Sequence, residues 1–207
     1  MSDNASGAVE RVGRLPLLRP AELDDAQRAV HEAVAAGPRA SGPFRVVDDD
    51  GRLLGPFNAL LHSPDVGLAV QELGARLRFA GSLSARVREL VICAVAAHWG
   101  SEYEWYAHSR VAAQVGVGPA ELVAVRAGRT PDGLDPAEEA AFRLAWSLLR
   151  DRAVDDDTYA HARAHHGEPG VVELCVLVGY YQLLAGLLAA SDVGAPEGTS
   201  GPDRTAR

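Results

Sequence analysis

Glu104 and His108 are ionisable residues placed four positions apart in a stretch of sequence with helical periodicity. At 100° per residue they fall on one side of that helix, together with apolar residues such as Val111. A carboxylate at this spacing can hold an imidazole and fix its tautomer. The pattern is typical of a positioned acid/base. It also fits a buried Glu–His pair whose two side chains satisfy each other's hydrogen bonds and have no catalytic role. The spacing leaves both interpretations open.

Glu89 is a third candidate, because it interrupts a helical stretch that is otherwise apolar on nearly all sides. Burial beside Ile92 and Cys93 would raise the pKa of its carboxyl group unless a cation or a histidine pairs with it. Arg86 and Arg88 are the nearest cations, and pairing with Glu89 or lying on the helix surface is a more ordinary role for either than binding a substrate carboxylate. Folding the two helices together would gather the three ionisable groups into one proton-transfer site.

Helical periodicity, caps and stop residues predict an all-α bundle of seven to nine helices. The predicted helices span residues 21–36, 64–80, 84–100, 101–115, 119–127, 135–152, 155–166 and 168–191. Residues 44–56 could form a small hairpin or an ordered loop. We expect a single domain over residues 15–193, between polar tails at 1–14 and 194–207.

The composition excludes several classes of protein. The 207 residues include 20 basic and 28 acidic side chains, and a net charge of −8 offers no footprint for nucleic acid. Every basic residue is arginine, which removes lysine Schiff bases and the phosphate-loop lysine. The sequence start has no secretory pattern, and the most apolar stretch, 171–190, contains polar residues typical of a buried core helix. We therefore expect a cytoplasmic protein without a membrane partner.

No motif for a phosphate loop, a redox CxxC pair, a zinc protease or a hydrolase elbow occurs in the sequence. His98, Glu104 and His108 carry nitrogen and oxygen donors, but their spacing matches no compact metal site. We therefore expect neither a metal nor a cofactor.

Three groups of residues together resemble the carboxymuconolactone decarboxylase family, which shares an all-α fold with the alkylhydroperoxidase AhpD. They are Arg-Val-Arg-Glu-Leu-Val-Ile at 86–92 with Ser-Glu-Tyr-Glu-Trp-Tyr-Ala-His at 101–108, the segment at 55–64, and Val-Glu-Leu at 172–174 with Gly-Tyr-Tyr at 179–181. The resemblance covers roughly residues 50–193, and the set is more specific than any of its pieces. It implies a homo-oligomer, commonly a trimer or hexamer, with active sites near subunit contacts.

The sequence departs from the family's peroxidase branch, which carries a glutamate and then Cys-x-x-Cys-x-x-x-His, with two thiols that do the redox work. Here the glutamate position is Glu89, the cysteine positions are Ser101 and Glu104, and the histidine is His108. The resemblance therefore implies the non-redox branch, a cofactor-independent lyase or isomerase.

The predicted function is proton transfer at carbon next to a carbonyl, in the decarboxylation or the double-bond or lactone isomerisation of a small organic acid. His108 is the acid/base and Glu104 orients it, while Glu89 assists, either as a second acid/base or by orienting the histidine. Contacts with the small-molecule substrate are predicted for four neighbouring residues, Arg86, Ser101, Tyr103 and Trp105. The alternatives are an alkylhydroperoxidase-like antioxidant protein and a non-catalytic oligomeric protein that binds a small ligand.

Overall fold

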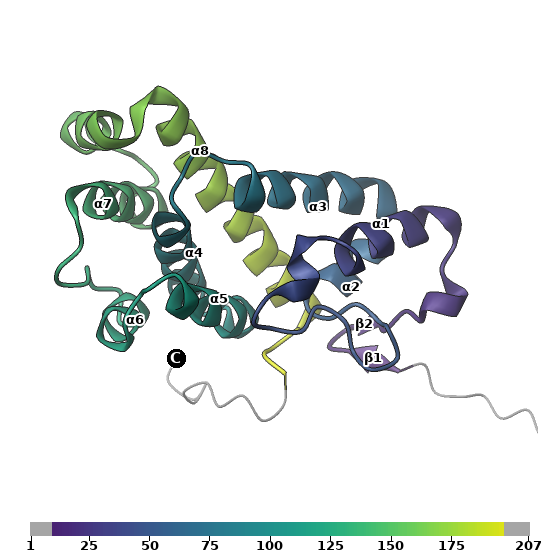
Figure 1. Ribbon diagram of the computed structural model, residues 1–207. Coiled ribbons are helices and arrows are strands. Elements are labelled where there is room, and N and C mark those ends of the chain that lie inside the picture. The colour runs from purple at the N-terminus through teal and green to yellow at the C-terminus, as the bar shows by residue number, and fades with distance from the viewer. Residues whose placement is uncertain (1–9, 197–207) are drawn as a thin grey trace, which may run out of the picture.

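The computed structural model describes residues 10–196 as a helical bundle with one small hairpin (Figure 1). The described residues form eight α-helices: α1 (Asp25–Ala35), α2 (Pro56–Leu61), α3 (Pro64–Phe79), α4 (Ala85–Trp99), α5 (Glu102–Gln114), α6 (Pro119–Arg126), α7 (Pro136–Arg150) and α8 (Asp156–Ser191). Two short 3-10 helices, η1 (Pro20–Glu22) and η2 (Pro38–Ser41), flank α1. The all-α fold class is therefore confirmed. Residues 1–9 and 197–207, most of the two predicted tails, lie outside the described residues.

The ordered fold begins before residue 15, where the sequence predicts the domain to start. Strands β1 (Arg11–Val12) and β2 (Leu15–Pro16) pair antiparallel across a tight turn. Gly13 in that turn approaches the end of α8 so closely that a Cβ would lie 2.2 Å from the carbonyl oxygen of Ser191. Residues 10–14 of the predicted tail are thus part of the structure, because their backbone packs against α8.

The main core forms around α4, which packs against α5, α7 and α8. Val91, Ile92 and Cys93 are fully buried, as expected for a helix that is apolar on nearly all sides. The side chain of Ser84 caps the helix start, and Gly100 ends it in the left-handed conformation with φ at 62°. The chain then turns back, so that α5 lies against α4 as predicted.

A second, smaller core lies between α1, α2, α3 and the loop that precedes α2. That loop contains one isolated antiparallel bridge between Val47 and Leu53, so residues 44–56 form a hairpin-like loop rather than a ladder. Helix α2 was not predicted. It begins at Pro56, whose fixed φ suits the first helical position, and all six of its residues are buried.

Helix α8 joins the two predicted helices at 155–166 and 168–191 into one element with a kink at Gly167, where φ is 66°. It is the one helix of the described residues that is long and apolar enough to cross a membrane, although half of its most apolar window is buried inside the protein. Core helices meet the same criterion, and the burial agrees with the predicted core helix. Val172 and Leu183 on its outer side stay exposed.

Candidate active site

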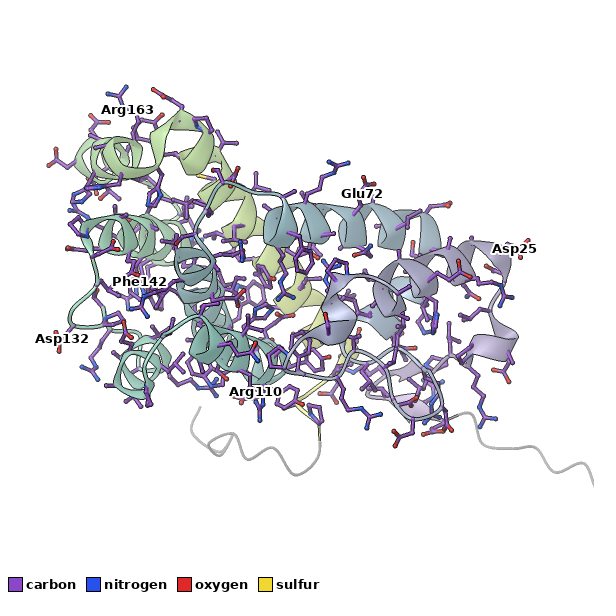
Figure 2. The ribbon with its side chains drawn as sticks, in the orientation of Figure 1. Asp25, Glu72, Arg110, Asp132, Phe142 and Arg163 are labelled. Atoms are coloured by element: carbon purple, nitrogen blue, oxygen red, sulfur yellow. The ribbon has the colours of Figure 1, made fainter. Side chains whose placement is uncertain are left out.

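The three predicted ionisable residues meet in the protein interior. Glu89 comes from α4 and is fully buried, while Glu104 and His108 come from α5 and are 3% and 4% exposed. Arg110, two residues further along α5, points away from the protein (Figure 2). As predicted, Glu104 and His108 lie on the buried face of α5, and Arg110 lies on its exposed face.

Glu89, not Glu104, makes the close hydrogen bond to the histidine. Oε2 of Glu89 lies 2.7 Å from Nδ1 of His108, whereas Oε2 of Glu104 lies 3.5 Å from Nε2. An ionised Glu89 accepts the Nδ1 hydrogen and leaves Nε2 free to take or give a proton. The geometry therefore favours Glu89 as the orienting residue, a role that the sequence predicted first for Glu104 and, as an alternative, for Glu89. The i, i+4 argument considered α5 alone, and the better aligned carboxylate comes from the neighbouring helix.

The two carboxyl groups are shifted in opposite directions. Burial alone would raise the pKa of Glu89, but the charge and hydrogen bond of His108, with the charges of Arg78 and Arg88, outweigh burial and lower that pKa. Burial raises the pKa of Glu104, and His108 and Arg78 offset this only in part. Such a divergence is the pattern of a site in which one carboxyl group is ionised and the other keeps its proton.

A small cavity adjoins Glu104 and His108. Its volume is about 20 Å³, which is enough for about one water molecule. The ring of Tyr181 from α8 meets the imidazole edge-on with 4.9 Å between ring centroids, and Phe44 approaches it at 6.2 Å. The imidazole is thus held by aromatic walls as well as by Glu89, and its Nε2 faces the cavity side of the site.

Of the four residues predicted to contact substrate, Tyr103 alone lines this cavity. Its buried hydroxyl group has no hydrogen-bond partner in the described part of the chain. The structure does not bring Arg86 to the cavity. Its guanidinium bonds to Glu121, Glu138 and the carbonyl oxygen of Gly116, and so it ties α4 to α6 and α7.

Ser101 and Trp105 also lie outside the cavity. Ser101 is the residue before α5, without a side-chain capping bond. Trp105 is half-buried, and the guanidinium of Arg126 covers its ring at 4.6 Å from the centroid. Ser101 and Trp105 therefore contact neighbouring residues of the protein and not the cavity. Residues from η2, α2, α3 and α8 line the cavity instead.

Sequence analysis missed two charged residues of the cavity wall, Arg39 from η2 and Arg78 from α3. Both lie outside α4 and α5, which carry the predicted ionisable residues, and no short motif links them to these helices. For α8 there was a signal, because the Tyr180–Tyr181 pair belongs to the stretch that resembles the family's closing helix. Both tyrosines line the cavity.

The two cysteines do not supply an activated thiol. Cys93 lies one helical turn after Glu89 but is fully buried, and burial together with the charges of Glu89 and Glu104 raises its pKa well above the ordinary value. Cys175 on α8 is exposed, and partial burial of its thiol raises its pKa too. A thiol that stays protonated is a poor nucleophile.

No group of three or more histidine, cysteine, aspartate or glutamate side chains suited to a metal ion occurs within residues 10–196. His98, which the sequence offered as a third ligand, instead packs edge-on against Trp146 with 5.9 Å between ring centroids. The absence of a cofactor stays a prediction.

One family model matches the chain. Residues 64–146 match the Carboxymuconolactone decarboxylase family, and this segment contains Glu89, Glu104 and His108. No curated protein matches the chain in sequence.

Solved structures share the fold at low sequence identity. An uncharacterized peroxidase-related protein from Ralstonia eutropha JMP134, described as an alkylhydroperoxidase AhpD core, has a TM-score of 0.72 and 18% identity over 91% of this chain and 94% of that one. The debrominase Bmp8 has a TM-score of 0.67 and 16% identity over 87% and 91%. An uncharacterized peroxidase-related protein from Silicibacter sp. TM1040 has a TM-score of 0.69 and 14% identity over 93% and 96%. The chain therefore carries a carboxymuconolactone decarboxylase family region, residues 64–146, within an AhpD-like helical fold.

Proposed function

We propose that the protein is a cofactor-independent lyase or isomerase that moves a proton at carbon next to a carbonyl group of a small organic acid. The observation that carries this proposal is the buried Glu89–His108–Glu104 group, in which one carboxylate holds the imidazole at 2.7 Å and a second carboxyl group lies 3.5 Å from the free nitrogen. Two buried carboxyl groups whose pKa values are shifted in opposite directions, on either side of an imidazole, are suited to proton transfer.

In the proposed isomerisation, Nε2 of His108 removes a proton from carbon and the C–H electron pair moves toward the neighbouring carbonyl. Glu89 stabilises the imidazolium that forms, because its carboxylate accepts the Nδ1 hydrogen. The protonated carboxyl group of Glu104 donates a hydrogen bond to the developing enolate oxygen. Return of the proton from Nε2 to another carbon completes the reaction and restores the neutral imidazole.

In the proposed decarboxylation, the same groups act in a different order. The bond between the carboxylate carbon and its neighbour breaks, carbon dioxide leaves, and the electron pair moves into the adjacent carbonyl to give an enolate. A protonated His108 then delivers its Nε2 proton to that carbon. Each positioned acid/base of this kind contributes about 10²–10⁴ in rate.

Substrate entry requires part of the cavity wall to move, because about 20 Å³ is far less than the volume of an organic acid. Arg39 and Phe44 supply wall residues from the segment between α1 and α2, which contains only a short 3-10 helix and one isolated bridge. This segment has the least regular hydrogen bonding to lose, so we infer that it yields when substrate binds.

The test is turnover of a panel of β-keto acids and lactone acids, followed as carbon dioxide release or ultraviolet change. Substitution His108→Ala should reduce turnover by about 10²–10⁴. The matched control is His165→Ala, since His165 is an exposed histidine on α8. Turnover should also survive alkylation of the thiols. Unchanged turnover in His108→Ala would refute the site assignment.

The alternative function is that of an alkylhydroperoxidase-like antioxidant protein, which the two peroxidase-related structural neighbours favour. The position of Glu104 in place of a thiol and the raised pKa of Cys93 argue against it. A thiol-dependent hydroperoxide assay separates the two functions, because peroxidase turnover lost on alkylation would support the antioxidant role. Ligand binding that withstands His108→Ala, without turnover of any panel member, would favour the non-catalytic binding protein.

The homo-oligomer, trimer or hexamer, and the cytoplasmic location also stay predictions. Sedimentation velocity measures the first, and fractionation of cells that express the protein measures the second.

A further inference from the structure

Two arginine side chains reach the cavity from elements outside the α4–α5 pair. Arg39 comes from η2 and is 4% exposed, and Arg78 comes from the last turn of α3 and is half-buried. Neither guanidinium forms an ion pair with a carboxylate of residues 10–196. Buried cations are usually paired, because removing a charge from water costs several kcal/mol.

Within residues 10–196, the groups that hold Arg39 are neutral. Its guanidinium donates to the side-chain and backbone carbonyl oxygens of Gln71, and it lies 5.8 Å from the ring centroids of both Phe57 and Phe79. Burial lowers the pKa of Arg39, and the nearby tyrosines Tyr180 and Tyr181 offset this only in part. The packing places the guanidinium at the cavity, and no carboxylate of residues 10–196 pairs with it.

Arg78 is also incompletely satisfied. Its Nε is shielded from solvent and has no hydrogen-bond partner in the described part of the chain. Its guanidinium lies 5.3 Å from the ring centroid of Phe79, which is a cation–π contact. Its charge lowers the pKa of both Glu89 and Glu104, although it forms no ion pair with either. Arg78 therefore lines the cavity with one N–H donor left unsatisfied by the described residues.

The balance of charge in the cavity is positive. Among the described residues that line it, Glu104, whose pKa is raised, is the one carboxyl group, and Arg39 and Arg78 are two cations. The ionised Glu89 lies behind His108, already bonded to the imidazole and 3.8 Å from Nε of Arg88. An anionic ligand would neutralise this surplus and satisfy the free donors.

A hydroxyl group converges on the same place. A Cβ built on Gly74 of α3 would lie 2.0 Å from Oη of Tyr180 and 2.8 Å from Nη2 of Arg39. The glycine therefore makes room for both polar groups beside the cavity. Burial raises the pKa of Tyr180 to about 12, so its hydroxyl group keeps its proton and can donate to an anion.

We propose that Arg39 and Arg78, assisted by the Tyr180 hydroxyl group, bind the carboxylate of a small organic acid and hold its reacting carbon toward His108. Arginine is suited to this, because its planar fork matches the two oxygens of a carboxylate. The sequence offered Arg86 and Arg88 for this task, but the structure engages Arg86 with α6 and α7 and places Arg88 beside Glu89.

This inference rests on the proposed function for the reaction, but the binding step can be measured without turnover. The probes are acetate, levulinate and benzoate, each compared with its neutral amide by titration calorimetry. Levulinate carries a ketone and a carboxylate, so it resembles the proposed class of substrate. We expect the carboxylates to bind the wild-type protein and the amides to bind at least about tenfold more weakly.

The variants Arg78→Gln and Arg39→Gln should each weaken levulinate binding by about 10- to 100-fold, as expected for the loss of a charged hydrogen bond. Arg76→Gln is the matched control, since Arg76 lies on the same helix with a 73% exposed side chain. Arg78→Lys should restore part of the binding, because it keeps the charge but not the fork. Thermal unfolding of the ligand-free variants verifies that they fold.

Several results would overturn the proposal: equal binding of acids and amides, levulinate binding that survives both arginine variants, or no carboxylate binding up to about 10 mM. Inorganic phosphate that binds as tightly as levulinate and depends on the same arginines would overturn the assignment to a carboxylate. The variant His108→Gln separates this inference from the proposed function. Levulinate binding that His108→Gln retains, with no turnover of the acid panel by wild type, would contradict the lyase while supporting the arginine site.

Discussion

The substitutions Glu89→Gln and Glu104→Gln should change stability with opposite dependence on pH. Both remove a buried carboxyl group beside the same imidazole, and both put a neutral side chain of similar shape in its place. They differ because the folded protein lowers the pKa of Glu89 and raises that of Glu104. A shift in pKa between the folded and unfolded states is a contribution to the free energy of unfolding.

The lowered pKa means that Glu89 stabilises the protein above its unfolded pKa of about 4.3, and that this stability is lost as pH falls through the folded pKa. Its bond to His108 is 2.7 Å long and fully buried. A hydrogen bond to a charged group contributes about 1.5–3 kcal/mol. We therefore expect Glu89→Gln to lose about that much at pH 7 and progressively less as the pH falls below about 4.3.

The sign is reversed for Glu104. Its raised pKa gives a relative stability that is fully present below the unfolded pKa and is lost as pH rises through the folded pKa. Glutamine does not titrate, so Glu104→Gln should gain stability relative to wild type between pH 4 and pH 8. The gain in the free energy of unfolding is about 1.4 kcal/mol for each unit by which the pKa of Glu104 in the folded state exceeds its pKa in the unfolded state.

Urea unfolding of both variants and wild type at a series of pH values from about 3 to 8 measures these differences. Glu72→Gln is the control, because the Glu72 side chain is 61% exposed and pairs only with Arg76 at the surface. Its effect should stay within about 0.5 kcal/mol at all pH values. A Glu104→Gln variant that loses more stability at pH 7 than at pH 4 would mean that Glu104 is ionised and paired, and the acid/base assignment would be wrong.

Three further predictions test the surroundings of the site. Gly55→Ala should destabilise the protein by more than about 1 kcal/mol in urea unfolding, because φ is +60° and the new Cβ would lie 2.0 Å from the Tyr103 ring. Arg86→Gln should lower the free energy of unfolding by about 1–3 kcal/mol but leave the KM for an acid substrate unchanged, because Arg86 bonds to α6 and α7; a raised KM would return it to the substrate site. In native protein a thiol reagent such as dithionitrobenzoate should label Cys175 and not Cys93, and rapid labelling of Cys93 would contradict its burial.

Local sequence signals predicted the helices of this protein well. The cap at Ser84 and the stop at Gly100 bound α4 to within a residue, because both act on the backbone next to them. Helix α2 escaped prediction because six buried residues are too few to show a helical period. The hairpin at residues 11–16 escaped because it depends on backbone contact with the distant end of α8.

In the candidate site, too, local signals predicted some residues, whereas others depend on contacts between distant segments. Periodicity brought Glu104 and His108 to one face of α5, and the turn after α4 brought Glu89 to them. The hydrogen-bond partner of His108 depends on the distance between two helices, which no single-helix argument contains. Arg39 and Arg78 were harder to predict, because they come from η2 and α3 and reach the cavity through tertiary packing that no local sequence signal describes.

The residues at positions 101 and 104 distinguish the proposed proton chemistry from the thiol chemistry of the peroxidase branch. The resemblance places a thiol of the peroxidase branch at position 104, whereas this chain has a carboxyl group whose pKa is raised by burial and whose Oε2 lies 3.5 Å from Nε2 of His108. The Glu89–His108 bond would serve either chemistry, since a held imidazole can activate a thiol as well as a carbon acid. The proposed proton transfer therefore rests on Glu104 at the position of the family's thiol, and the proposed binding of an acid substrate rests on Arg39 and Arg78 in the cavity wall.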